Sequence, residues 1–368
     1  MVNREELKYW VSFSGVPGIG KAKVYHLLEC FGSLRDAWTA PEKDLKRAGL
    51  DSRSLQALIA IRATLSPDAE LDRLEDQHIN AFTCEDSDYP ASLKQIYDYP
   101  PVLFVKGDLP KTAEPCLAVV GTRRPTAYGR QAAGELVADL VRSGVHIVSG
   151  LARGIDSVAH QSALDAGGTT VAVFASGLDI VYPRENARLA ASITEHGALI
   201  SEHPLGTRPK PESFPLRNRI MSGISLGVLV IEAGERSGAL ITAHQALEQN
   251  REVLAVPGSI FSPASNGTNR LILEGAKLVR QCEDVIEELN LGAVTQQLPL
   301  TMPSPSNDTE SAILRHLSNE PTHIDEICRG SGLPMSELSS ALAMMELKGI
   351  ARQLGGMNYV LGKGNKAE

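Results

Sequence analysis

The sequence of 368 residues lacks a surplus of positive charge, a long hydrophobic run and any clustered cysteines. Because the net charge is −8, bulk attraction to polyanions is excluded, and a nucleic-acid site must be a local basic patch. No segment approaches the roughly 18 apolar residues that cross a bilayer. The charged N-terminus also lacks the apolar stretch of a signal peptide. We therefore expect a soluble, cytoplasmic protein with no membrane partner.

The five cysteines form no Cys-x-x-Cys pair and have no nearby histidine pair, which argues against a zinc site or a disulfide framework. Aromatic residues make up only 5% of the chain, so an aromatic side chain in a polar, glycine-rich segment stands out. Apolar residues make up 43% and charged residues 22%, as in a soluble globular protein. The length predicts two or three domains.

Residues 1–80 have apolar residues at helical spacing and predict a helical N-terminal domain of the helix-hairpin-helix or SAM-like kind. Its "VPGIG" segment, Val16 to Gly20, resembles a hairpin whose glycines let backbone N–H groups approach a phosphate. Lys21 and Lys23 follow at positions where they could add a phosphate contact. The alternative is a tight interhelical turn that binds nothing, and both interpretations stay open.

Residues 81–290 alternate short apolar runs with amphipathic segments, which predicts a Rossmann-like, doubly wound and mostly parallel α/β sheet. A first strand is expected within "PPVLFVKGDL". Further strands are expected at 116–121, 144–150, 169–175, 198–201, 226–233 and 252–258, and helices at 127–142, 155–166, 185–195, 217–223 and 239–248.

Residues 291–307 are rich in Pro, Ser, Thr and Gln and predict a flexible linker. Residues 308–362 then give three helices and two short strands around Gly355 and Gly356, the order of a winged-helix-like domain. Its third helix carries Glu337 and Glu346 with Lys348 as its cation. A helix that reads DNA is expected to be more basic, so contact with a protein is an equal alternative.

Ligands of parallel sheets bind beyond the carboxyl ends of the strands, and here the loops at those ends are glycine-rich and polar. They contain neither a G-x-G-x-x-G fingerprint nor a Walker A loop, which disfavours NAD enzymes, motors and kinases. They do gather cations at one predicted edge: Arg123, Arg124, Arg153, Arg208, Lys210, Arg217 and Arg219. Phe214 is expected on an ordered loop among them, as a platform for a stacked base.

Three polar residues near these loops have less specific expectations. Asp156 is expected to cap its helix or to accept a hydrogen bond from Arg153. His160 and His244 are expected to pack against the sheet. No Ser/His/Asp arrangement and no pair of carboxylates has the spacing that would indicate catalysis.

Six segments in unbroken order between about residues 85 and 290 resemble the DNA-processing protein A family, also called DprA or Smf. They include "VVGTRRPTAYG", "IVSGLARGIDSVAHQSAL", "LISEHPLGTRPKPESFPLRNRIMSG" and "LVIEAGERSGALITAHQALEQNREVLAVPG". The resemblance implies a non-enzymatic protein without cofactor that binds single-stranded DNA, protects incoming DNA and loads the RecA recombinase during natural transformation. It also implies a homodimer.

Carried onto this sequence, the resemblance and the cationic loops together give one candidate DNA-binding set. The resemblance implies that Arg123 contacts a phosphate and that the turn at Ser149 and Gly150 supplies backbone N–H groups. It also places Lys210, Phe214, Arg217 and Asn218 on a basic-aromatic loop. The full set is Gly121, Thr122, Arg123, Arg124, Ser149, Gly150, Arg153, Lys210, Phe214, Arg217, Asn218 and Arg219.

Two other functions remain as alternatives. One is a nucleoside-monophosphate phosphoribohydrolase of the "lonely guy" type on a related fold. Such enzymes use a Pro-Gly-Gly-x-Gly-Thr loop and an arginine-glutamate pair, whereas this chain has "EAGERSGALITA" and "FPLRNR". The general acid or electrostatic partner that cleavage of a glycosidic bond requires is missing. The other is a transcription regulator that acts through the C-terminal domain.

Overall fold

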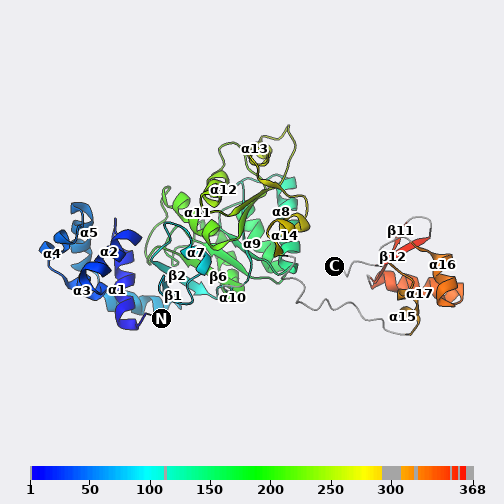
Figure 1. Cartoon of the computed structure of the whole chain (residues 1–368), viewed down its shortest axis with the longest axis horizontal. Helices are drawn as coiled ribbons and strands as arrows, with labels where there is room; N and C mark the ends of the chain where they lie inside the picture. Colours follow the sequence, from blue (N-terminus) through cyan, green and yellow to red (C-terminus); the bar gives the residue numbers. More distant parts are fainter. Residues whose placement is uncertain are drawn as a thin grey trace. The chain divides into compact units, whose positions relative to one another are not determined.

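The computed structural model describes residues 2–111, 114–291, 308–318, 322–348, 350–354 and 357–361. The chain divides into two units, residues 1–295 and 296–368, drawn from blue to red in Figure 1. The predicted helical domain and the predicted α/β core belong to the same unit. Apart from Leu291, the predicted linker lies outside the described residues. No described helix is long and apolar enough to span a membrane.

The N-terminal region is helical, as predicted. Its elements are α1 (Arg4–Ser14), α2 (Lys21–Phe31), α3 (Leu34–Thr39), α4 (Glu42–Arg47), α5 (Ser52–Arg62) and α6 (Pro67–Asp76). Short polar residues begin several of them: the side chains of Asn3 and Ser66 accept hydrogen bonds from backbone N–H groups in the first turns of α1 and α6. Apolar side chains such as Phe13, Leu27 and Leu58 are buried between the helices.

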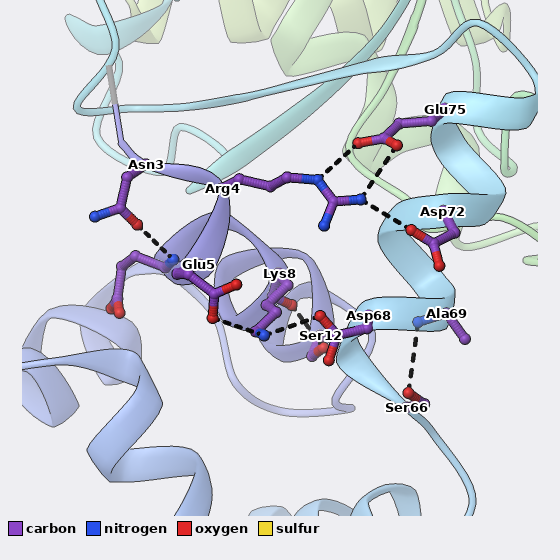
Figure 2. Close-up of polar contacts among 11 residues, drawn as sticks. Asn3, Arg4, Glu5, Lys8, Ser12, Ser66, Asp68, Ala69, Asp72 and Glu75 are labelled. Atoms are coloured by element: carbon purple, nitrogen blue, oxygen red, sulfur yellow. Dashed lines mark hydrogen bonds and ion pairs between the residues drawn. The ribbon is translucent and has the colours of Figure 1, made fainter.

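Ion pairs join α1 and α6, which lie about 60 residues apart in the sequence (Figure 2). The Lys8 ammonium is 2.9 Å from carboxylate oxygens of both Glu5 and Asp68, and the Arg4 guanidinium contacts Asp72 and Glu75. Lys8 is only 7% exposed, so its charge needs compensation. Its two carboxylate partners, Glu5 first, raise the pKa of Lys8.

The "VPGIG" hairpin is a turn whose lysines are engaged inside the protein. Lys23 donates to the Gly18 carbonyl and the Ser54 hydroxyl, each at 2.8 Å, and pairs with Asp51. Lys21 donates to the Tyr97 carbonyl, and its ammonium lies 3.6 Å from the ring centroid of Tyr99. Because both ammonium groups already have partners, the geometry favours the interhelical turn over a phosphate-binding hairpin.

The core is a nine-stranded sheet in the order β1-β2-β6-β5-β4-β3-β7-β8-β9. Its strands are β1 (Asn80–Thr83), β2 (Val102–Gly107), β3 (Cys116–Val120), β4 (His146–Ser149), β5 (Thr170–Val173), β6 (Gly197–Ser201), β7 (Gly227–Val230), β8 (Glu252–Ala255) and β9 (Lys277–Leu278). Strands β3 to β9 run parallel, and β1 and β2 add an antiparallel edge. The predicted, mostly parallel α/β sheet is confirmed.

The strand order reverses at β3. From β3 the chain proceeds through β4, β5 and β6 in one direction along the sheet, and β7, β8 and β9 continue from the other side of β3. The carboxyl ends of β3 and β7 therefore form a topological switch point, the place where doubly wound sheets bind ligands. This edge holds the loops in which the sequence concentrates its glycines and arginines.

Helices cover both faces of the sheet. They are α8 (Ala127–Arg142), α9 (Ile155–Asp165), α10 (Ala187–His196), α11 (Ser213–Ile224), α12 (Gly238–Glu248), α13 (Asn266–Leu273) and α14 (Cys282–Glu288), with the short α7 (Ala91–Lys94) before β2. Side chains of α8, α9 and α14 form one buried cluster with the sheet, and α10, α11 and α12 contribute to the other. Helix α11 begins four residues earlier than predicted, so Phe214 lies in its first turn and not on a loop.

The described residues of the C-terminal unit form three helices, α15 (Asp308–Leu314), α16 (Ile324–Ser331) and α17 (Met335–Leu347). A small antiparallel sheet follows the order β10 (Thr322–His323), β12 (Asn358–Leu361), β11 (Ala351–Leu354). Its core contains Ile313, Ile327 and Leu342. The predicted turn at Gly355 and Gly356 lies outside the described residues. Glu337 and Glu346 are exposed on α17.

We expect Leu229→Ala to lower the free energy of unfolding by about 2–5 kcal/mol, because Leu229 is fully buried in β7 and its loss leaves a cavity. Leu273→Ala is the matched control, since Leu273 is 89% exposed at the end of α13. Urea denaturation followed by circular dichroism measures both. Equal effects of the two substitutions would contradict the assignment of β7 to the core.

Candidate nucleic-acid interface

Three loops meet at the switch point of the sheet. Residues 121–126, called here the Arg123 loop, follow β3, residues 150–154 follow β4, and residues 231–237 follow β7. Together with the start of α11 they surround a cavity of about 600 Å³, called here the switch-point cavity. Its lining includes Thr122, Arg123, Asp156, Phe214, Arg217, Asn218, Arg236 and Thr242. Cations, polar groups and one aromatic ring thus line the same cavity.

Arg123 and Phe214 stand together at the rim of this cavity. The Arg123 guanidinium lies 5.5 Å from the centroid of the Phe214 ring, at cation–π distance. The Phe214 ring is 5.6 Å from the ring of Tyr182, and the two planes are tilted by 54°. Tyr182 is half-exposed and was not among the sequence-predicted residues. The rim therefore offers a charged group and two aromatic faces within one short span.

The Arg123 loop is held closely against the loop that follows β4. Gly154 has a φ of +83°, and a Cβ atom there would lie 2.3 Å from the Thr122 carbonyl oxygen and 2.8 Å from Arg123 Cα. The Ile155 N–H donates to the same Thr122 carbonyl at 3.2 Å. Only glycine permits this approach, so the "GLARGID" segment positions the backbone of Arg123.

Arg217 forms part of the cavity floor and is 4% exposed. Its Nη1 donates to the carbonyls of Gly150, at 2.6 Å, and Val173, and its Nε donates to Asn218 Oδ1 at 3.2 Å. Burial lowers the pKa of Arg217 to about 10, although the charge of Asp156 opposes the shift. Arg217 remains cationic at neutral pH, but its hydrogen bonds anchor it inside the fold instead of leaving it free on a loop.

Ser149 and Gly150 do not present the free N–H groups expected of them. Ser149 is fully buried in the parallel ladder opposite Ala172, and its hydroxyl donates to the Val119 carbonyl at 2.7 Å. The N–H groups of Gly150 and Ala152 are directed to the buried carboxylate of Asp156. Burial raises the pKa of Asp156, and the Arg217 charge opposes that shift. This turn is therefore internally satisfied.

Two arginines of the predicted set have carboxylate partners. Arg153 forms a bidentate pair with Glu185, at 2.8 and 2.7 Å, so the expected bond from Arg153 to Asp156 is wrong. Arg219 lies between Asp98, at 2.9 Å, and Glu202, at 2.7 Å, and its side chain is only 11% exposed. Its charge is therefore paired with two carboxylates of the protein itself.

The remaining predicted cations are exposed and available. Among the residues that the structure describes, no carboxylate lies within ion-pair distance of Arg123, Arg124, Arg208 or Lys210. The same holds for Arg236, at the cavity edge before α12, which sequence reasoning missed. A run of exposed arginines without carboxylates is the electrostatic requirement for a local phosphate-binding patch on an acidic protein.

The two histidines have different environments. His160 is fully buried against the sheet, as expected, and its Nδ1 donates to Thr170 Oγ1 at 2.7 Å. Burial, aided by the Arg217 charge, lowers the pKa of His160 to about 3. His244 is exposed on α12, so the expectation that it packs against the sheet is wrong. Helical register alone does not tell which side of α12 meets the sheet.

The fold and the site define a doubly wound α/β protein with a cationic, aromatic-edged cavity at the switch point of its sheet. The family model for DNA recombination-mediator protein A matches residues 80–290, and the model for the DprA winged helix domain matches residues 299–357. The chain belongs to this DNA recombination-mediator protein A family, whose members are called DprA or Smf.

Relatives and solved structures agree with this assignment. DNA processing protein DprA of Bacillus subtilis is 49% identical over 215 residues, which cover 58% of this chain and 72% of the relative. The X-ray structure of DprA from Streptococcus pneumoniae is 37% identical, with a TM-score of 0.67, and the match covers 78% of this chain and 99% of that one. A structure of DprA from Helicobacter pylori, described for its single-stranded DNA binding mode, is 30% identical with a TM-score of 0.52 and covers 58% and 97%.

The depressed pKa of His160 predicts acid sensitivity. Its ordinary value of 6.5 applies in the unfolded chain, against about 3 in the folded protein. Between these two values the unfolded chain binds a proton that the folded protein does not, so stability falls as pH falls. We expect His160→Asn, which can keep a contact to Thr170, to flatten the dependence of unfolding free energy on pH in this window. His244→Asn, at an exposed position, is the control and should leave the slope unchanged.

Proposed function

We propose that this protein binds single-stranded DNA at the switch-point cavity. The observation that carries the proposal is the placement of Arg123 over Phe214 at the rim, with exposed arginines and Lys210 on the neighbouring loops and no carboxylate paired to them among the described residues. The DNA-binding mode described for the Helicobacter pylori relative supports the same class of ligand.

The chemistry of the rim favours a single strand over a duplex. An aromatic face can stack with any base, but only a base whose own face is not already covered by its duplex neighbours. Such a contact contributes about 1–3 kcal/mol per base and does not depend on sequence. The exposed cations neutralise backbone phosphates, and each neutralised phosphate steepens the log–log salt dependence by about 0.7 for single strands. The switch-point cavity lies directly behind this platform.

We also propose that the protein acts without catalysing a reaction. The carboxylate in the switch-point cavity belongs to Asp156, which is buried and accepts backbone N–H groups. A glycosidic reaction needs a carboxyl group placed to donate a proton or to stabilise a cation. Incubation with nucleoside monophosphates tests this: release of free base that Asp156→Asn abolishes would replace the binding function with the phosphoribohydrolase alternative.

We also propose the cellular role that the resemblance implies. The protein protects incoming DNA and loads RecA onto it during natural transformation, as a homodimer in the cytoplasm. Light scattering measures the oligomeric state. Assembly of RecA filaments on DNA coated with single-strand-binding protein measures loading. A stimulation of filament assembly that is absent with Arg123→Ala would support the role, and no stimulation by the wild type would contradict it.

A fluorescence-anisotropy titration is the decisive test of strand preference. Single- and double-stranded oligonucleotides of one sequence are compared at several salt concentrations. We expect tighter binding of the single strand, with a linear log–log dependence on salt. A preference for duplex would falsify the proposal. Duplex binding that survives deletion of residues 81–290 would instead support a regulator that acts through the winged-helix domain.

Two substitutions separate charge from stacking. We expect Arg123→Ala to weaken binding of all sequences alike and to reduce the salt slope by about 0.7, because one phosphate contact is lost. We expect Phe214→Ala to weaken binding by about 1–3 kcal/mol with little change in slope. Arg142→Ala, at the far end of α8, and Tyr97→Ala, at a fully exposed tyrosine, are the controls and should bind normally. A large slope change with Phe214→Ala would contradict its role as a stacking platform.

A further inference from the structure

The buried carboxylate of Glu232 lies against the Arg123 loop. Glu232 follows the end of β7, is 2% exposed, and was not among the sequence-predicted residues. Its Oε1 accepts a hydrogen bond from the Thr126 hydroxyl at 2.7 Å, and its Oε2 accepts one from the Thr126 N–H at 2.8 Å. Its backbone carbonyl accepts the Thr122 N–H at 2.7 Å. One residue thus holds both ends of the segment from 122 to 126.

The surroundings of Glu232 suit a charged carboxylate. Within the described residues it has no ion-pair partner, and its two oxygens are satisfied by donors on Thr126. Thr126 also caps α8, accepting the Gly129 N–H at 3.1 Å, so the carboxylate lies at the start of a helix of 16 residues. The positive end of the helix dipole favours an anion there. A Cβ atom on residue 129 would lie 2.5 Å from Glu232 Oε2, so Gly129 leaves the space that the carboxylate occupies.

The segment between these two anchors carries the exposed cations of the rim. Arg123 and Arg124 have exposed side chains, and no carboxylate of the described residues orients either of them. Their direction is therefore set by the backbone of the Arg123 loop. Gly154 supports that backbone on one side and Glu232 on the other. If the Glu232 anchor is lost, the Thr126 end of the loop keeps only its hydrogen bonds to the first turn of α8.

We propose that Glu232 is a positioning residue for strand binding, whose carboxylate holds the Arg123 loop in the conformation that presents Arg123 to Phe214. The inference rests on the proposed function. It predicts a change in DNA affinity opposite to the change that bulk electrostatics predicts. Removing a negative charge beside a DNA site tightens binding through charge alone. Removing the Glu232 anchor weakens binding, because the loop loses its fixed position.

The test is Glu232→Gln, measured by anisotropy with a labelled oligothymidylate at several salt concentrations. A glutamine oxygen can still accept the Thr126 N–H, but its NH₂ group can only donate to the Thr126 hydroxyl, which already accepts the Gly129 N–H at 3.1 Å. The charge-assisted hydrogen bond from that hydroxyl to the carboxylate is therefore lost. We expect binding to weaken about ten-fold, the scale of one charge-assisted hydrogen bond, and the salt slope to fall toward that of Arg123→Ala. The matched control is Glu235→Gln, which makes the same charge change at an exposed position of the same loop and should bind as tightly as the wild type or tighter.

A double-substitution cycle identifies the route of the effect. If Glu232 acts through Arg123, Glu232→Gln adds nothing to the loss already caused by Arg123→Ala. A full additive loss in the double variant overturns the inference. Thr126→Ala and Thr126→Ser provide a second test that leaves the buried carboxylate in place. The alanine variant removes the hydroxyl donor and should weaken binding, whereas the serine variant should restore it.

The outcomes separate this inference from the function on which it rests. If Arg123→Ala weakens binding while Glu232→Gln and Thr126→Ala bind like the wild type, the role of Glu232 is overturned and the strand-binding site stands. If Arg123→Ala itself binds like the wild type, the assignment of the site fails. Thermal unfolding of each variant shows whether a loss of binding accompanies a loss of the folded state.

Discussion

The site depends on one buried interaction, the set of hydrogen bonds that the Arg217 guanidinium makes beneath the switch-point cavity. It donates to carbonyls of Gly150 and Val173, which follow β4 and end β5, from a position on α11. A Cβ atom on residue 150 would lie 2.3 Å from Arg217 Nη1, so any larger residue there would displace the guanidinium from these carbonyls. Because a buried cation is costly unless it is paired and hydrogen-bonded, these contacts lock the strands to the helix that carries Phe214.

This arrangement explains how an acidic protein can present a basic site. Its arginines have two different environments. Arg153, Arg217 and Arg219 are bonded within the protein, and they hold loops and helices in place. Arg123, Arg124 and Arg236 remain exposed around the cavity. A positive rim above a polar floor is what the proposed phosphate contacts need, because a net charge of −8 does not attract polyanions to the protein as a whole.

The carboxylates near the cavity, like the buried arginines, are bonded to groups of the protein itself. Asp156 accepts the N–H groups of Gly150 and Ala152 in the turn after β4, and Glu232 accepts the N–H and the hydroxyl of Thr126. Each is buried and saturated by donors of its own chain, so each organises a loop and is not placed to transfer a proton. This arrangement supports the binding function proposed above.

The sequence by itself determined the class of fold and the edge of the sheet at which the arginine-rich loops meet. Apolar runs alternating with amphipathic segments specify a parallel sheet covered on both faces, and glycine-rich loops must then meet at its carboxyl edge. Helix α8 was predicted with its observed ends, because its polar cap and apolar spacing are local signals. The motifs around Arg123 and Phe214 likewise predict a ligand site at this edge.

Only the tertiary structure decided which charges are free. Arg217 and Arg219 stand two residues apart on one helix, yet one is bonded to carbonyls and the other to Asp98 and Glu202. Those partners come from segments distant in the chain, and no local pattern encodes them. The same is true of Tyr182, which meets Phe214 of α11 from the loop after β5, and of Glu232, which reaches Thr126 from 106 residues away. Residue type and spacing place cations at an edge, but long-range packing decides which of them can meet a ligand.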